Sequence, residues 1–147
     1  MRKAIISVLI ITAAAFLPGA WLSDLGRTGW NEAVAASDLA ARTSSTRGVT
    51  VKVTPQNVAA GAQTWDFAVV LDTHSADLND DLLKSSLLLD SAGGRHAPVA
   101  WDGARPGGHH REGVLRFKPV APRPQSIELQ ITRAGEDTPR SFRWPLR

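Results

Sequence analysis

The chain has 147 residues, of which 43% are hydrophobic and 21% are charged, and it contains no cysteine. This composition is typical of one globular domain and excludes an intrinsically disordered protein, disulfides and thiolate metal sites. The formal charge of +3 is unevenly distributed, because residues 48–104 carry 3 basic and 7 acidic side chains whereas residues 105–147 carry 9 basic and 4 acidic ones. The basic residues are spread out and are not interleaved with aromatic side chains, so we expect no nucleic-acid partner.

The N-terminus has the pattern of an export signal. Arg2 and Lys3 precede an uncharged, apolar run from residue 4 to residue 22. A positive start followed by an apolar segment is typical of a secretory signal peptide, and a run of this length also suffices for a single membrane anchor. Residues 1–22 are therefore predicted to be a helical signal peptide or anchor. Both alternatives place the protein outside the cytoplasm, in the periplasm or cell envelope or extracellularly.

Residues 23–47 are rich in Ala, Ser, Thr and Arg; residues 31–41 could form a short helix, but Ser, Thr and Arg dominate its end. We expect a flexible linker here. If the anchor is retained, this segment tethers the domain to the membrane.

Residues 48–147 have the alternating pattern of short β-strands. In 48–54, for example, Val49, Val51 and Val53 share one face. Turn residues separate seven such segments, and residues 91–95 are predicted to join the third and fourth of them in a hairpin. The expected strands cover 48–54, 63–72, 86–90, 98–101, 113–118, 126–132 and 140–146. Seven strands at this spacing predict an all-β, immunoglobulin-like sandwich of two antiparallel sheets, with a core built on the aromatic residues Trp65, Phe67, Phe117, Phe142 and Trp144.

A first polar loop follows the second strand, in the segment LDTHSADLNDDL of residues 71–82. It supplies Asp72 and four further oxygen side chains, Asp77, Asn79, Asp80 and Asp81. Oxygen ligands suit Ca²⁺, but the loop lacks the glycine and glutamate of an EF-hand. The alternative is that Asp72, Thr73 and Ser75 bond the local backbone while Asn79 or Asp80 caps a short helical turn.

A second polar loop contains the sequence GGHH, with His109 and His110 side by side. Imidazole is a good ligand for Zn²⁺ and Cu²⁺, which we therefore expect in preference to Ca²⁺ if a metal binds. His74 of the first loop is a third candidate ligand, and Asp72 or Asp102 is a candidate carboxylate. The alternative is that one histidine packs under the glycine-rich loop while the other is solvated. We expect His96, in the hairpin, to be merely exposed.

The motifs LDTHS, WDG, GGHH and F-x-W occur together across residues 48–147. In this combination the chain resembles a family of small exported prokaryotic proteins of uncharacterised function, and the resemblance implies no activity. No nucleophile motif or phosphate-binding loop is present, so we expect a non-enzymatic protein. The predicted function is binding of a divalent metal or a small polar ligand by the two loops. The alternative is a structural or protein-interacting sandwich whose histidines only brace the fold.

Overall fold

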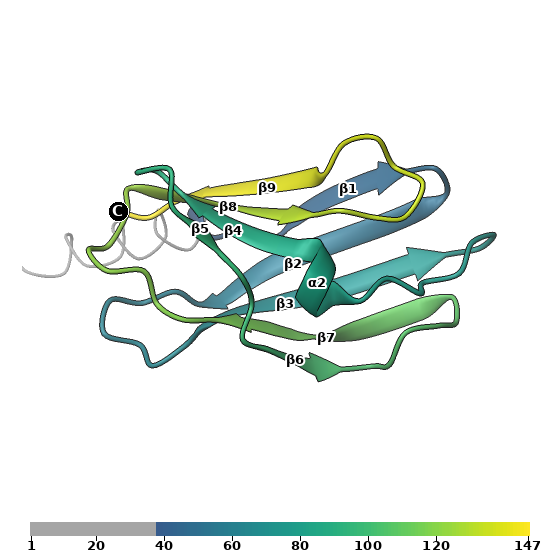
Figure 1. Ribbon diagram of the computed structural model, residues 1–147, viewed down its shortest axis with the longest axis horizontal. Coiled ribbons are helices and arrows are strands. Elements are labelled where there is room, and N and C mark those ends of the chain that lie inside the picture. The colour runs from purple at the N-terminus through teal and green to yellow at the C-terminus, as the bar shows by residue number, and fades with distance from the viewer. Residues whose placement is uncertain (1–37) are drawn as a thin grey trace, which may run out of the picture.

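The computed structural model describes residues 38–147, and it is an all-β domain of two antiparallel sheets (Figure 1). The first sheet has five strands, in the order β1 (Arg42–Thr46), β2 (Val49–Asn57), β3 (Trp65–Thr73), β7 (His110–Phe117) and β6 (Ala100–Gly103). The second sheet has four, in the order β5 (Arg95–His96), β4 (Ser86–Asp90), β8 (Ser126–Ile131) and β9 (Arg140–Pro145). One short helix, α2 (Leu82–Ser85), precedes β4. The prediction of two antiparallel sheets is confirmed, with nine strands within residues 38–147 instead of about seven.

The core lies between the sheets and follows the alternation seen in the sequence. In β3, Trp65, Phe67, Val69 and Leu71 are buried, while the residues between them face outward. Phe67 packs edge-on against Phe117, with ring centroids 5.6 Å apart. The five aromatic residues predicted for the core are all at most 2% exposed, so that prediction is confirmed. Burial of such large apolar surfaces is the main term that stabilises the sandwich.

The first strand lies inside the segment that was predicted to be a linker, residues 23–47. β1 pairs with β2 through a two-residue turn in which Arg47 and Gly48 both have positive φ, as a tight hairpin of this length requires. The ordered domain thus begins before residue 48. The strand escaped prediction because RTSST is polar on both faces: its fold comes from pairing with β2, not from an apolar stripe.

A buried arginine joins this hairpin to the second sheet. The Arg140 guanidinium donates to the carbonyl oxygens of Ser44, Thr46 and Val49 at 2.9–3.0 Å. Its other side is paired with Glu136, with N–O distances of 2.9 and 2.5 Å. This hydrogen bond, opposed by burial, lowers the pKa of Glu136. Edge strands β1 and β9 are therefore held together across the side of the sandwich.

The predicted turn at residues 91–95 is confirmed, but the strand predicted to follow it, residues 98–101, does not pair with β4. β4 pairs with the two-residue strand β5, while β6, which contains Trp101, crosses to the first sheet and pairs with β7. The ring of Trp101 lies against Gly103 and Gly113, where a Cβ would come within 2.7 and 2.8 Å of it. Trp101 of the WDG motif thus packs over two glycines that are partners in the ladder between β6 and β7, and this contact stabilises their pairing.

The predicted signal or anchor, residues 1–22, lies outside the described residues, as does the linker up to residue 37. Within residues 38–147, none of the helices has the length and apolarity needed to cross a membrane.

Candidate functional site

Two distant segments meet at one end of the sandwich, at the right in Figure 1. The end of β3 lies beside the start of β7, where Asp72 and His110 are partners in the ladder. The backbone N–H of Thr73 donates to the carbonyl of His109 at 2.9 Å, and Leu78 exchanges hydrogen bonds with Gly107 and Gly108. We call this end, formed by residues 72–81 and 103–112, the rim. The LDTHS and GGHH loops, which the sequence predicts to bind one ligand together, are therefore in contact.

The rim is held from the inside by the guanidinium of Arg111, which is only 1% exposed. It donates to the carbonyl oxygens of Leu78, Asp80 and Ala104 at 2.9, 2.8 and 3.3 Å. It also lies 5.8 Å from the centre of the Trp101 ring, a cation–π distance. Burial lowers the pKa of Arg111 while the nearby Asp80 and Asp81 act against the shift, and because the ordinary value is so high the group stays charged. One buried cation thus ties both loops together.

Two acidic residues of the first loop, Asp80 and Asp81, make contacts that stabilise the fold. Asp80 pairs with Arg133 at 2.7 Å, and both side chains are 7% exposed. Asp81 caps α2, because its carboxylate accepts from the N–H of Leu83 at 3.1 Å. The alternative predicted from the sequence, a short helical turn with a capping side chain, is confirmed. The capping residue is Asp81 and not Asn79 or Asp80.

Thr73 organises the beginning of the loop. Its hydroxyl donates to the carbonyl of Gly48 at 2.9 Å and accepts from the N–H groups of Ser75 and Ala76 at 3.3 and 3.1 Å. The predicted local bonding is therefore present for Thr73. The Thr73 hydroxyl thus serves as the hydrogen-bond partner of backbone groups that leave the strand ladder, which allows the chain to turn here.

The outer surface of the rim carries an imidazole between two carboxylates. Nδ1–H of His110 donates to Asp72 at 2.5 Å, and Nε2 of the same ring lies 3.7 Å from Glu112. The His110 and Asp72 side chains are 57% and 55% exposed. The hydrogen bond to Asp72 raises the pKa of His110, against a smaller opposing effect of burial and with help from the charge of Glu112. This group therefore carries a positive charge to higher pH than an ordinary histidine does.

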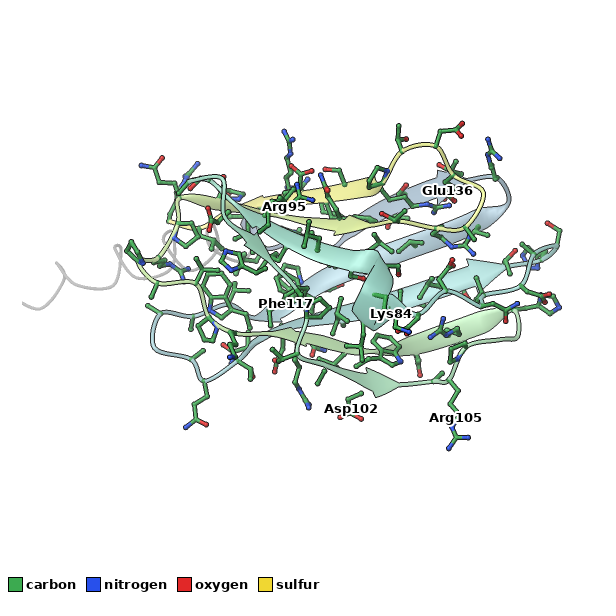
Figure 2. All side chains as sticks on the ribbon, in the orientation of Figure 1. Lys84, Arg95, Asp102, Arg105, Phe117 and Glu136 are labelled. Carbon is green, nitrogen blue, oxygen red and sulfur yellow. The ribbon has the colours of Figure 1, made fainter. Side chains whose placement is uncertain are left out.

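The remaining predicted site residues are placed apart from this trio. His109 is exposed and donates from Nδ1 to the carbonyl of Ala76 at 3.2 Å, while His74 is exposed without a side-chain hydrogen bond to residues 38–147. Asp102 lies on β6 and pairs with Arg116 at 3.4 Å; Figure 2 shows it at the outer edge of the sheet. Of the predicted set, the structure brings Asp72 and His110 into contact. Among the described residues, no three His, Asp or Glu side chains are arranged to hold a metal ion.

Sequence reasoning missed the buried arginines. The signal for Arg111 was available, since strand alternation places it on the same face as Leu115 and Phe117, between the outward-facing His110 and Glu112. It also misjudged His96, which is only partly exposed and is hydrogen-bonded to Asp90 at 2.8 Å.

Comparisons of the chain with models of protein families, with curated proteins and with solved structures gave no match. The family resemblance suggested by the four motifs therefore stays a prediction.

Proposed function

We propose that the protein is an exported, non-enzymatic binding domain whose ligand binds on the outer surface of the rim. The observation that carries the proposal is the contrast between the two sides of β7 at this end. Arg111 fixes both loops from within, whereas Asp72, His110 and Glu112 remain exposed on the fixed surface. A rigidly held set of polar groups loses little conformational entropy when it binds a ligand.

The ligand classes that fit are a divalent metal ion and a small polar molecule. Asp72 and His110 provide one oxygen and one nitrogen ligand, and Glu112, 3.7 Å from Nε2 of His110, is a candidate for a third. His109 and His74 are exposed side chains of the same rim. The nitrogen ligands favour Zn²⁺ or Cu²⁺ over Ca²⁺. A metal bound through Nδ1 of His110 requires the Asp72–His110 hydrogen bond to open, because the metal replaces the shared proton. A metal bound through Nε2, which lies 3.7 Å from Glu112, leaves that hydrogen bond in place.

Binding is favoured over catalysis because the paired groups are open to water. General acid–base and nucleophilic catalysis draw their strength from a site that excludes solvent and aligns a nucleophile with its base. The His110–Asp72 pair is more than half exposed. Export is supported by the sequence of the first 22 residues, with Arg2 and Lys3 before the apolar run.

The strand order supports the proposal that the sandwich is immunoglobulin-like. Immunoglobulin sheets have the orders A-B-E-D and C-F-G, with C′ beside C in some variants. Starting the count at β2, the present orders β2-β3-β7-β6 and β5-β4-β8-β9 correspond to A-B-E-D and C′-C-F-G. The rim then lies at the B-to-C and D-to-E end, where sandwiches commonly carry recognition loops.

Isothermal titration of the purified chain with Zn²⁺, Cu²⁺ and Ca²⁺ tests the metal version. We expect saturable heat with Zn²⁺ or Cu²⁺, lost in the variants His110→Ala and Asp72→Asn. Asp137→Asn is the matched control, because Asp137 is an exposed carboxylate in the β8–β9 loop. Silence from all three ions defeats the metal version, and unchanged heat in the two rim variants places any binding elsewhere.

A second candidate is a protein-interacting sandwich whose histidines only brace the fold. It is favoured by the bond of His109 to the carbonyl of Ala76 and by β6, which within residues 38–147 is an edge strand of the first sheet. An edge strand offers backbone groups to a partner strand. On this view His109→Ala lowers the unfolding midpoint, and metal ions leave it unchanged.

A further inference from the structure

The opposite end of the sandwich, at the left in Figure 1, contains a hollow of about 650 Å³. It lies between the β4–β5 turn and the segment that joins β7 to β8. Its volume falls within the range of about 300–1,000 Å³ that is usual for small-molecule sites. The lining combines charged or polar groups with an apolar wall: Asp90, His96, Arg123 and Gln125 on one hand, and Val120, Pro122 and Pro124 on the other.

The first polar feature of the hollow is the pair Asp90–His96. The Asp90 side chain is 6% exposed and accepts from the backbone N–H groups of Ala92 and Gly94 at 2.8 and 2.9 Å. Its other oxygen accepts from Nε2 of His96 at 2.8 Å. Gly94 is required here, because a Cβ on it would collide with the Asp90 carboxylate.

Three donors thus satisfy the Asp90 carboxylate, and the hydrogen bonds from His96 and Gly94 lower its pKa. In the neutral form of the imidazole, the proton on Nε2 makes this hydrogen bond to Asp90, and Nδ1 of His96 is left as an acceptor. The pair is a fixed acceptor at the wall of the hollow, and the ionised Asp90 keeps its negative charge, which its three hydrogen bonds partly offset.

The second polar feature is Arg123. One of its terminal nitrogens donates to the carbonyl of Val58 at 2.5 Å, and the guanidinium lies 6.0 Å from the centre of the Trp65 ring. These two contacts fix the plane of the group. Its Nε and second terminal nitrogen make no hydrogen bond with residues 38–147, which leaves two donor nitrogens, with three N–H groups, for a ligand. A guanidinium that is held in place and still has donors is well suited to a carboxylate.

We propose that this hollow binds a small organic carboxylate that also carries a hydroxyl or N–H donor. The carboxylate pairs with Arg123, the donor group bonds to Nδ1 of His96, and the carbon skeleton packs on Val120 and Pro122. The site is separate from the rim and does not depend on the function proposed for it. It would make the domain a two-ended binding module.

An NMR titration of the ¹⁵N-labelled full chain with L-lactate, propionate and inorganic phosphate at neutral pH tests the proposal. Lactate has both groups, propionate lacks the hydroxyl, and phosphate lacks the carbon skeleton. We expect lactate to shift the amide signals of Gly94, His96 and Gln125 in a saturable way. Propionate should bind several-fold more weakly, because one hydrogen bond is worth about 1 kcal/mol. No saturable shift with lactate, or equally strong binding of phosphate, overturns the proposal.

Substitutions of Arg123 and His96 test the two proposed ligand contacts separately. Arg123→Gln should weaken lactate binding about tenfold or more, as expected for a lost charged hydrogen bond, and Arg123→Lys should weaken it less. His96→Phe should remove the preference for lactate over propionate. Arg95→Gln is the matched control, because Arg95 is an exposed neighbour of His96 that does not line the hollow. Near-ultraviolet circular dichroism checks that each variant is folded, and a loss in Arg95→Gln equal to that in Arg123→Gln contradicts the assignment.

Discussion

The inner and outer sides of the rim differ in how their charged groups are used. On the inner side, Arg111 is buried and each of its three hydrogen bonds goes to a backbone carbonyl. On the outer side, the next residue back along the chain, His110, is exposed and bonds to another ionisable side chain. Neighbouring residues of one strand can therefore have different roles, one in stability and the other in recognition. Changes on the inner side are expected to act on the free energy of unfolding, and changes on the outer side on binding and titration.

The largest effect is expected for Arg111→Met. The variant removes the donors of three carbonyl groups and leaves both loops without their common partner, which should lower the free energy of unfolding by about 3 kcal/mol. Urea unfolding followed by tryptophan fluorescence measures it. The matched control is Arg105→Met, because Arg105 lies in the same rim and points away from the domain (Figure 2). A loss as small as that of the control would show that Arg111 does not brace the rim.

A smaller effect is expected for Glu136→Gln, which tests the second internal brace, around Arg140. Figure 2 shows Glu136 in the loop between β8 and β9. The variant should be destabilised by about 2 kcal/mol at pH 7, since Arg140 stays buried and loses its countercharge.

The pH dependence of this variant follows from the lowered pKa of Glu136. Because this pKa is lower in the folded than in the unfolded chain, ionised Glu136 stabilises the fold above its ordinary value of 4.5. That stabilisation is lost as the pH falls through the folded-state pKa. Urea unfolding at pH 7 and at pH 3 should therefore show a difference between wild type and Glu136→Gln that shrinks in acid. A difference that is independent of pH would rule out an ionised Glu136 as its source.

The smallest effect on stability is expected on the outer side, for Asp72→Asn. Removal of this carboxylate should lower the pKa of His110 toward the ordinary value of 6.5 and leave the unfolding midpoint nearly unchanged. The raised pKa means that the Asp72–His110 pair contributes its small stabilisation below pH 6.5 and loses it as the pH rises through the folded-state pKa.

NMR titration of the imidazole signals measures this change. Asp102→Asn is the control, because Asp102 is an exposed carboxylate on the first sheet that pairs with Arg116. If the pKa of His110 falls equally in both variants, the effect comes from the general field of the sheet and not from the hydrogen bond to Asp72.

Much of the fold was predictable because strand alternation is a local property. The valines of β2 and the aromatic residues of β3 and β9 identified their own buried faces. β1 was not predictable, because a polar strand has no such pattern and takes its conformation from β2 and Arg140. The candidate site was predictable only in part: the motifs identified two loops that meet, while the contact of Asp72 with His110 depends on the register of β3 with β7.

The sequence by itself determined the two apolar sheet faces, the aromatic core and the position of the polar loops, because these follow from the period of two along each strand. Tertiary structure alone decided which polar groups became internal braces and to which sheet β6 belongs. The physical reason is that a buried guanidinium is tolerated only where carbonyl or carboxylate partners converge on it. Those of Arg111 come from residues 7, 31 and 33 positions away, a distance over which local sequence patterns carry no information.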